Sequence, residues 1–118
     1  MTSVSRRNYD SNDKIREDLA PQANATISVA ESLGAVYADL NRLSTDYLNA
    51  IGPDNGHKYN LNPNDNTHIS KSGSVLFGNM VSELLVEGSG SASFKQWTAP
   101  NSTIVKDIKA GTFILPDA

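Results

Sequence analysis

Asp65–Val86 reads DNTHISKSGSVLFGNMVSELLV and holds the clearest pattern in the chain. Apolar side chains recur at every fourth residue of its second half, in one row at Leu76, Met80 and Leu84 and in an adjacent row at Phe77, Val81 and Leu85. This spacing is typical of a helix with one apolar face. We therefore predict a helix that begins near residues 70–72.

A carboxylate and an imidazole stand just before this helix, at Asp65 and His68. An imidazole can take the proton of a hydroxyl nucleophile, and a carboxylate on its other ring nitrogen fixes the tautomer and stabilises the imidazolium. A spacing of three on a turn that enters a helix can point both side chains into one cleft. A bare D-x-x-H is, however, more often a polar loop with a turn-capping aspartate and a solvated histidine.

The preceding residues predict an alternation of helices and strands. We expect helices over residues 19–33 and 40–51, because their apolar residues recur at spacings of three and four. Between them, Ala35-Val36-Tyr37-Ala38-Asp39 is a mostly apolar run of strand length, and residues 2–5 favour a second strand. Residues 54–66 read as a loop. This order is that of the end of an α/β domain, whose parallel sheet needs further strands.

The composition changes at Gly88-Ser89-Gly90-Ser91, which reads as a flexible linker. Residues 1–87 then form one part of a domain, and residues 92–118 form a tail of unknown role. The tail contains Trp97 and a few apolar residues. It either packs back on the domain as an irregular cover or serves as a junction.

Composition narrows the classes of partner. The net charge of −3 and the pI near 5.2 provide no basic patch for nucleic acid, and no apolar run approaches the length of a membrane span. We expect no nucleic-acid partner, no membrane contact and no cofactor. The absence of cysteine excludes disulfides and thiolate ligands. His57, Asp65 and His68 could in principle bind a metal, but their spacing matches no established zinc pattern, so we expect none.

The block from Asn64 to Leu85 resembles the last conserved block of the SGNH (GDSL-type) serine hydrolases, in which D-x-x-H precedes a glycine and the final helix. Weaker similarity, at Thr2-Ser3-Val4-Ser5-Arg6-Arg7, around Ala30 and at Val36-Tyr37-Ala38-Asp39-Leu40, extends the resemblance over residues 2–86. This part of the chain looks like the second half of fungal rhamnogalacturonan acetylesterase-like proteins.

The resemblance implies the C-terminal part of a three-layer, flavodoxin-like α/β fold with a parallel sheet and flanking helices. It implies that His68 is the catalytic base and that Asp65 orients it. The implied substrate is an acetylated cell-wall polysaccharide, and the implied location is outside the cell, although no signal peptide is visible after Met1.

The rest of the family pattern is missing. In the family, the nucleophilic serine lies in a G-D-S block. The other oxyanion donors of the family are a glycine and the asparagine of a G-x-N-D block. None of these blocks occurs here. Ser89 has no strand–turn–helix around it to make a nucleophile elbow. The chain therefore reads as a fragment of an ester hydrolase. The alternatives are a catalytically inactive remnant or truncated gene product, or an interaction module.

Three further features have two readings each. His57 is either a solvated loop residue, which we favour, or a ligand. The pair Arg6-Arg7 either contacts an acidic pectic substrate or is an ordinary surface pair. Trp97 either stacks on sugar or packs on the domain.

Overall fold

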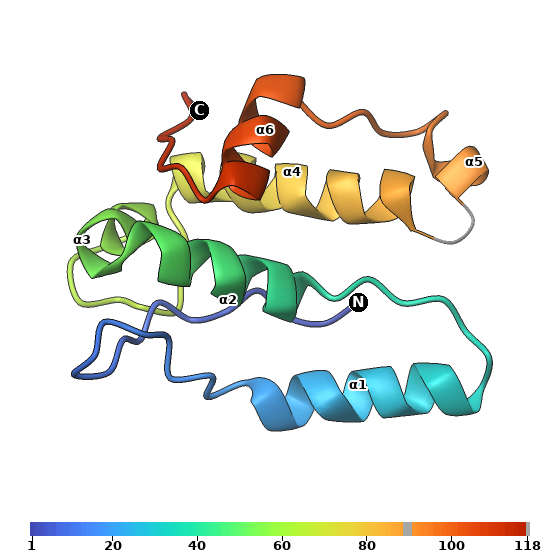
Figure 1. The fold of residues 1–118 in the computed structure, drawn as a ribbon, viewed down its shortest axis with the longest axis horizontal. Coiled ribbons are helices and arrows are strands. Elements are labelled where there is room, and N and C mark those ends of the chain that lie inside the picture. The colour runs from blue at the N-terminus through green and yellow to red at the C-terminus, as the bar shows by residue number, and fades with distance from the viewer. Residues whose placement is uncertain (89–90, 118) are drawn as a thin grey trace.

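A computed structural model describes residues 1–88 and 91–117, and the regular elements in these ranges are all helices, joined by extended segments and turns. The elements are, in order, α1 (Ala20–Ser32), α2 (Leu40–Ile51), α3 (Pro53–Gly56), the 3-10 helix η1 (His57–Tyr59), α4 (Lys71–Glu87), α5 (Ser91–Phe94) and α6 (Ser102–Ala110). Figure 1 shows α1 on one side, α2 in the middle, and α4 on the other side with α5 and α6 beside it. The expected linker spans residues 88–91, and its two central residues, Ser89 and Gly90, lie outside the described residues.

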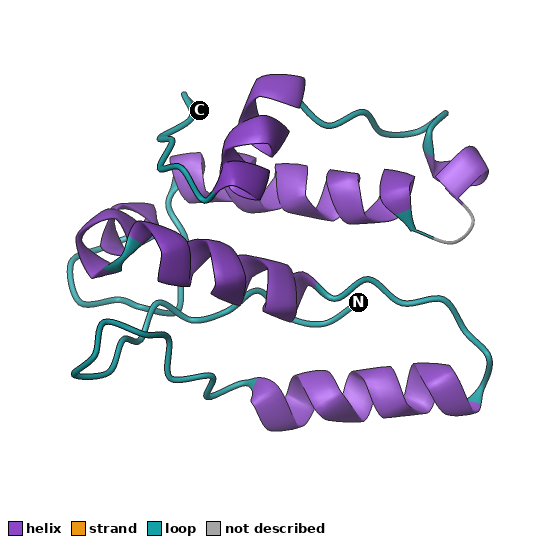
Figure 2. Ribbon diagram, viewed as in Figure 1, coloured by secondary structure: helices purple, strands orange, loops and turns teal. Residues whose placement is uncertain are grey.

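The expected parallel sheet is wrong. Figure 2 shows no strand in the described part of the chain, and the pairings there are two isolated antiparallel bridges, Tyr9 with Ile15 and Asn60 with Ile69. Residues 35–39 are extended, but the backbone contact that joins them to residues 2–5 is a single hydrogen bond, from the N–H of Thr2 to the carbonyl of Ala38 at 3.0 Å. The fold is therefore not an α/β fold of the flavodoxin-like type.

Side chains explain why the N-terminal segment does not continue as a strand. The hydroxyl of Thr2 accepts from the N–H of Asn41 at 2.8 Å and donates to Asp39 at 2.8 Å. The N–H of Ser5 donates to the hydroxyl of Ser44 at 2.9 Å. The segment thus binds the start of α2, where the backbone N–H of Ser5 has a side-chain acceptor instead of a partner in a β ladder.

The core lies where α2, α4 and α6 meet. The helix predicted over the amphipathic run is confirmed, since α4 begins after Ser70, whose hydroxyl accepts from the N–H of Gly73 at 3.1 Å. The buried apolar cluster joins side chains of these helices to η1: Leu40, Tyr47, Leu48, Tyr59, Leu76, Phe77, Met80, Ile104 and Ile108. Of the rows predicted for α4, Leu76, Phe77 and Met80 belong to this cluster and Val81 and Leu84 pack against it, whereas Leu85 does not.

The helix predicted over residues 19–33 is also confirmed, but it packs poorly. Of the α1 residues, all of which the structure describes, Ala23 alone is buried, while the neighbouring Leu33 is 76% exposed. The C-terminus is well formed, because Gly34 at φ +62° donates to Glu31 and the N–H of Ala35 donates to Ala30, which is a Schellman motif. Figure 1 shows α1 set apart from the other helices.

The tail packs back on the domain, as a helix rather than as an irregular cover. The side chain of Asn101 caps the N-terminus of α6, and Gly111 at φ +64° ends it. Beyond α6, the hydroxyl of Tyr47 donates to the carbonyl of Thr112 at 3.1 Å, and Tyr59 donates to that of Ile114. Before α6, Trp97 is 82% exposed, so it does not pack on the domain.

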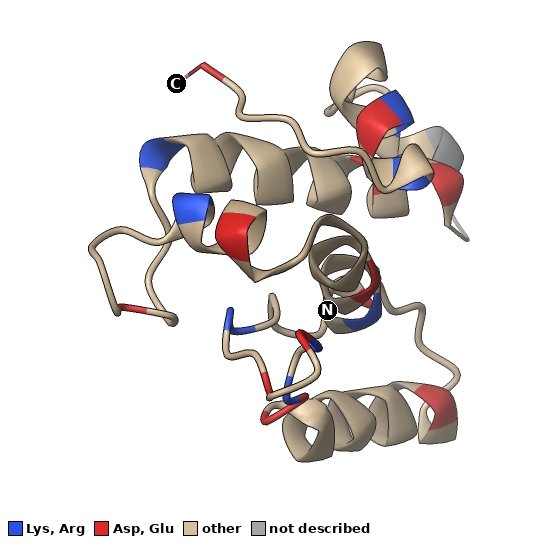
Figure 3. Ribbon diagram, turned by 60° about the vertical axis from the view of Figure 1, so that its left-hand side comes forward, with Lys and Arg blue, Asp and Glu red and all other residues tan. Residues whose placement is uncertain are grey.

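The loop expected at residues 54–66 is partly wrong, because α3 and η1 occupy its first half. Acidic and basic side chains are interspersed along the ribbon, and α1 carries a charge only at Glu31 (Figure 3). No helix in the described residues combines the length and the apolar character that crossing a bilayer requires.

Candidate functional site

The side chains of Asp65 and His68 are hydrogen-bonded, as their spacing predicts. Nδ1 of His68 lies 3.0 Å from Oδ2 of Asp65 and 3.2 Å from Oδ1. The same carboxylate accepts from the backbone N–H of His68 at 2.9 Å and from that of Thr67 at 3.1 Å. The aspartate therefore closes its own turn and holds the imidazole at once.

The local sequence explains this turn. Asn64 adopts a left-handed conformation at φ +66°, which asparagine tolerates better than most residues, and the N–H of Asp65 donates to the carbonyl of Asn62 at 3.1 Å. The chain then runs back beside itself, because the N–H of Leu61 donates to the carbonyl of His68 at 3.1 Å. His68 is thus fixed two residues before the N-cap of α4.

The electrostatics favour an ionised carboxylate. The backbone N–H of His68, the imidazole and the N–H of Thr67 all donate to Asp65 and lower the pKa of its carboxyl below the ordinary value of 3.8. Hydrogen bonds to the charged form have this effect because they are lost on protonation. Asp65 is therefore an anion at neutral pH and accepts a hydrogen bond from the N–H at Nδ1 of His68.

The imidazole of His68 is open on its other side. The side chain is 72% exposed, and no hydrogen bond joins Nε2 to another described residue. Nδ1 bound to a carboxylate and a free Nε2 are what a general base for a hydroxyl group requires. No serine of the described chain hydrogen-bonds the ring, so the nucleophile of a triad is not assembled here.

His57 has a structural contact that sequence reasoning did not anticipate. Its Nε2 lies 3.0 Å from the carbonyl oxygen of Arg7, and its ring meets the ring of Tyr9 edge-on at a centroid distance of 5.3 Å. It is exposed, but it is tied to the N-terminal segment and not to His68. Among the described residues, no group of three histidine or acidic side chains is arranged to hold a metal ion.

The pair Arg6-Arg7 is not a surface pair, because one side chain is partly exposed and the other is buried. Arg6 is partly exposed, with Nη1 3.7 Å from Asp18, whereas Arg7 is fully buried. Its Nη2 donates to the carbonyl of His68 at 2.7 Å, which places it beside the candidate site. Consecutive side chains of an extended segment point to opposite sides, and this rule would have predicted that one of the two faces inward.

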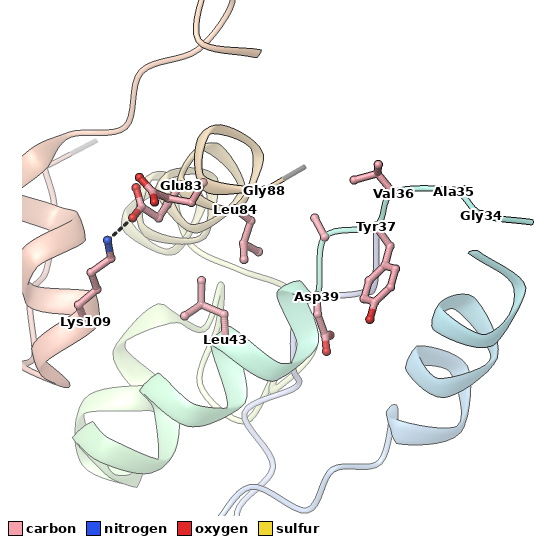
Figure 4. Close-up of a pocket in the computed structure, with 12 residues that line it drawn as sticks. Gly34, Ala35, Val36, Tyr37, Asp39, Leu43, Glu83, Leu84, Gly88 and Lys109 are labelled. Atoms are coloured by element: carbon pink, nitrogen blue, oxygen red, sulfur yellow. Dashed lines mark ion pairs between the residues drawn. The ribbon is translucent and has the colours of Figure 1, made fainter. Parts of the chain in front are cut away.

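A cavity of about 840 Å³ opens elsewhere, between the extended segment 34–39 and α4. Figure 4 shows Leu43 and Leu84 pointing toward each other in it, and an ion pair between Glu83 and Lys109 at its edge. Neither Asp65 nor His68 lines this cavity. The expected cleft for the pair is therefore not this one.

Comparisons with protein-family models, with curated proteins and with solved structures found no match for this chain.

Proposed function

We propose that this chain carries the acid–base half of an ester hydrolase, in which His68 is the general base and Asp65 orients it. The SGNH type rests on the sequence resemblance alone, because the helical fold of the described residues does not reproduce the parallel sheet of that family. The observation that supports the proposal most is the hydrogen bond of 3.0 Å from Nδ1 of His68 to Asp65, with Nε2 free and the ring exposed. The resemblance of residues 64–85 to the last block of that family supports the reaction class. The acetylated cell-wall polysaccharide, as substrate, rests on this resemblance alone.

The proposed chemistry follows the usual order of acyl transfer. Nε2 of His68 takes the proton of a serine hydroxyl as its oxygen attacks the ester carbonyl, and Asp65 stabilises the imidazolium. The imidazolium then protonates the departing sugar oxygen, which leaves an acetyl-serine. Water, deprotonated by the same imidazole, releases acetate and restores the serine. The proposal requires that another polypeptide segment supply the serine and the oxyanion donors, because none is recognised among these residues.

The decisive test begins with the transcript that encodes this chain. In-frame G-D-S and G-x-N-D blocks upstream of Met1 are expected, and the longer polypeptide should release acetate from acetylated pectic polysaccharide. Its turnover should fall by several orders of magnitude in His68→Ala and less in Asp65→Ala, whereas His57→Ala should retain it. A longer polypeptide that keeps its activity in His68→Ala would refute the assignment, and upstream stop codons would favour an inactive remnant.

The 118-residue chain by itself should show no saturable hydrolysis of an aryl acetate. Removal of the serine alone from a serine hydrolase costs about 10⁶ in turnover, and what remains there comes from the oxyanion hole and substrate binding. Neither is recognisable in this sequence. An exposed imidazole can hydrolyse an activated ester slowly, so His57→Ala and His68→Ala are the controls. Saturable turnover that is lost in both His68→Ala and Asp65→Ala would mean that a serine of this chain completes the triad.

A second function, binding of another polypeptide without catalysis, is favoured by one observation. Large apolar side chains are exposed on and after α1, at Val29, Leu33 and Val36. Val29 and Leu33 are one helical turn apart, whereas Val36 lines the cavity beside α4, and exposed apolar residues on one helix face are typical of interaction surfaces. Size-exclusion chromatography tests whether these residues bind a second copy of the chain. Self-association that is removed by Leu33→Ser together with Val36→Ser would support this function.

A further inference from the structure

Arg7 buries a positive charge without an ion pair to any described acidic residue. Its guanidinium donates instead to oxygens: Nε to the side chain of Asn60 at 2.6 Å, Nη2 to the carbonyl of His68 at 2.7 Å, and Nη1 to that of Ser5 at 3.4 Å. A buried charge is costly unless its donors are satisfied. Carbonyl oxygens supply all the hydrogen bonds of this guanidinium, so the guanidinium fixes the positions of those oxygens. The carboxylate of Asp65 also attracts the charge of Arg7, although the two form no ion pair.

Arg7 holds two main-chain carbonyl groups of the turn at residues 65–68, one before and one after Thr67. Its backbone N–H donates to the carbonyl of Asn66 at 2.9 Å, and its side chain holds the carbonyl of His68. These two contacts bracket Thr67, in the turn that Asp65 closes. A single residue from the N-terminal segment thus holds the main chain on either side of this turn.

Amide side chains extend this clamp. Nδ2 of Asn60, whose oxygen accepts from Arg7, donates to Oδ1 of Asn66 at 2.8 Å. Nδ2 of Asn66 in turn donates to Oδ1 of Asn8 at 2.9 Å. The turn is held by side chains and main chain from residues 7–8 and 60, while the His68 ring itself stays exposed.

We propose that Arg7 is a positioning residue for the His68 imidazole, which it acts on through the main chain of residues 66–68. This inference rests on the proposed role of His68 as a base. Without the clamp, the turn is free to move, and Nδ1 loses its fixed carboxylate partner. Arg7 itself touches neither the imidazole nor a substrate.

The tautomer of the His68 ring reports this role in the intact chain. A carboxylate on Nδ1 keeps the proton of the neutral ring on that nitrogen. The ¹⁵N shifts of Nδ1 and Nε2, recorded about two pH units above the ordinary histidine pKa of about 6.5, measure this preference. His68→Ala assigns the signals, and far-UV circular dichroism establishes that each variant is folded.

Arg7→Met should shift the His68 ring toward the tautomer protonated on Nε2. Arg7→Lys keeps the charge but presents its N–H donors from a single nitrogen, so it should retain part of the preference for Nδ1. Arg6→Met is the matched control, since Arg6 is the same residue type, one position away and partly exposed, and it should leave the shifts unchanged. A folded Arg7→Met that keeps the full preference for Nδ1 would overturn the proposal.

If Arg7→Met does not fold, Asn60→Ala decides the question, because it leaves Arg7 in place and removes the acceptor of its Nε. Asn60 also donates to Asn66, so Asn66→Ala, which removes that contact and leaves Asn60 available to Arg7, is the control. Loss of the Nδ1 preference in a folded Asn60→Ala that exceeds the loss in Asn66→Ala would support the proposal, and unchanged shifts or equal losses would refute it. Wild-type protein with no preference for Nδ1 would show instead that the Asp65–His68 contact, and with it the proposed function, is wrong.

Discussion

Helices α1 and α4 are both predicted by the spacing of their apolar residues, yet the structure uses them differently. In α4, Leu76 and Met80 are completely buried against α2 and η1. In α1, Ala23 is the one buried residue of the thirteen. Apolar spacing therefore locates a helix along the chain, but it does not establish that the helix has a partner in the same chain.

The two helices also differ at their N-termini. The hydroxyl of Ser70 caps α4, whereas no side chain caps α1 at Leu19. An isolated helix of about 12–15 residues is marginal in water, because its first turn is costly to form and packing supplies most helical stability in proteins. We therefore expect α1 to open independently of the rest, while α2, α4 and α6 unfold as one unit.

The largest expected difference between the two regions comes from matched leucines. Leu48→Ala in the buried cluster should lower the free energy of unfolding by about 2–5 kcal/mol, because it leaves a cavity. Leu33→Ala, at a residue that is 76% exposed, should change it by about 0.5 kcal/mol or less. Urea unfolding, followed by the helix signal in circular dichroism at about 220 nm, measures the free energy of unfolding of both variants.

Since the core is small for the length of the chain, the wild-type protein should be only marginally stable, and Leu48→Ala should be largely unfolded without denaturant. Equal losses in the two variants would show that α1 belongs to the same cooperative unit as the core. A sharp, highly stable transition of a wild-type monomer would show that the exposed apolar residues of α1 need no further partner.

Matched tyrosines should give the next largest effect. The hydroxyl of Tyr47 meets that of Tyr59 at 3.1 Å and also contacts the backbone of residues 112 and 114. Tyr47→Phe should therefore cost about 1–2 kcal/mol, because it leaves buried polar groups without a partner. Tyr37→Phe removes one exposed contact, to Glu31 at 3.3 Å, and should change stability by less than about 0.5 kcal/mol.

Thermal unfolding of the two phenylalanine variants in parallel checks this difference. Amide hydrogen exchange gives a second readout, since Tyr47→Phe should speed exchange in the C-terminal segment after α6. Loss of stability in Tyr37→Phe equal to that in Tyr47→Phe would mean that the extended segment 34–39 is as firmly held as the core.

A smaller effect is expected from matched asparagines. Oδ1 of Asn101 accepts from the N–H groups of Thr103 and Ile104 at 3.0 and 3.2 Å, so Asn101→Ala should cost about 1 kcal/mol through loss of the N-cap. Asn24→Ala, on the exposed face of α1, should raise local helicity slightly, because alanine has the higher helix propensity. Hydrogen exchange of α6 and α1 measures the two changes, and opposite signs are the expected outcome.

The smallest effect concerns pH at the candidate site. The pKa of Asp65 is lowered in the folded chain, so its carboxylate stabilises the fold above the ordinary carboxyl pKa. That contribution is lost as the pH falls through the lowered value. The stability difference between the wild type and Asp65→Asn should therefore vanish at acid pH. Thermal midpoints of both proteins from about pH 7 to about pH 2 test this, and a difference that persists at the acid end would exclude Asp65 as its source.

Local features of this fold could be predicted from the sequence, and long-range ones could not. The bounds of α2 and α4 follow from apolar spacing, Gly52-Pro53 and the cap at Ser70, all of which act over a few residues. The hydrogen bond between Asp65 and His68 is local for the same reason. The strand predicted at residues 35–39 was wrong, because a short, mostly apolar run shows a tendency to extend but does not show which segment it would pair with.

The burial of Arg7 is the clearest case of a long-range feature. Its partners Asn60 and His68 are more than fifty residues away in the chain, so no neighbouring residue signals the contact. The N-terminal segment presents the opposite difficulty. The β-leaning composition of residues 2–5 is overridden by two hydrogen bonds to α2, one from the N–H of Asn41 to the hydroxyl of Thr2 and one from the N–H of Ser5 to the hydroxyl of Ser44.

The exposure of Trp97 determines how this protein should be followed in solution. It is the single tryptophan of the chain, and at 82% exposed it already lies in water in the folded state. Its emission maximum should therefore stay nearly constant through unfolding of the core, and a fluorescence melt would report no transition in a protein that does have one. Tyr47 and Tyr59, which are buried together, are the natural optical probes of the core, through near-ultraviolet absorbance or circular dichroism.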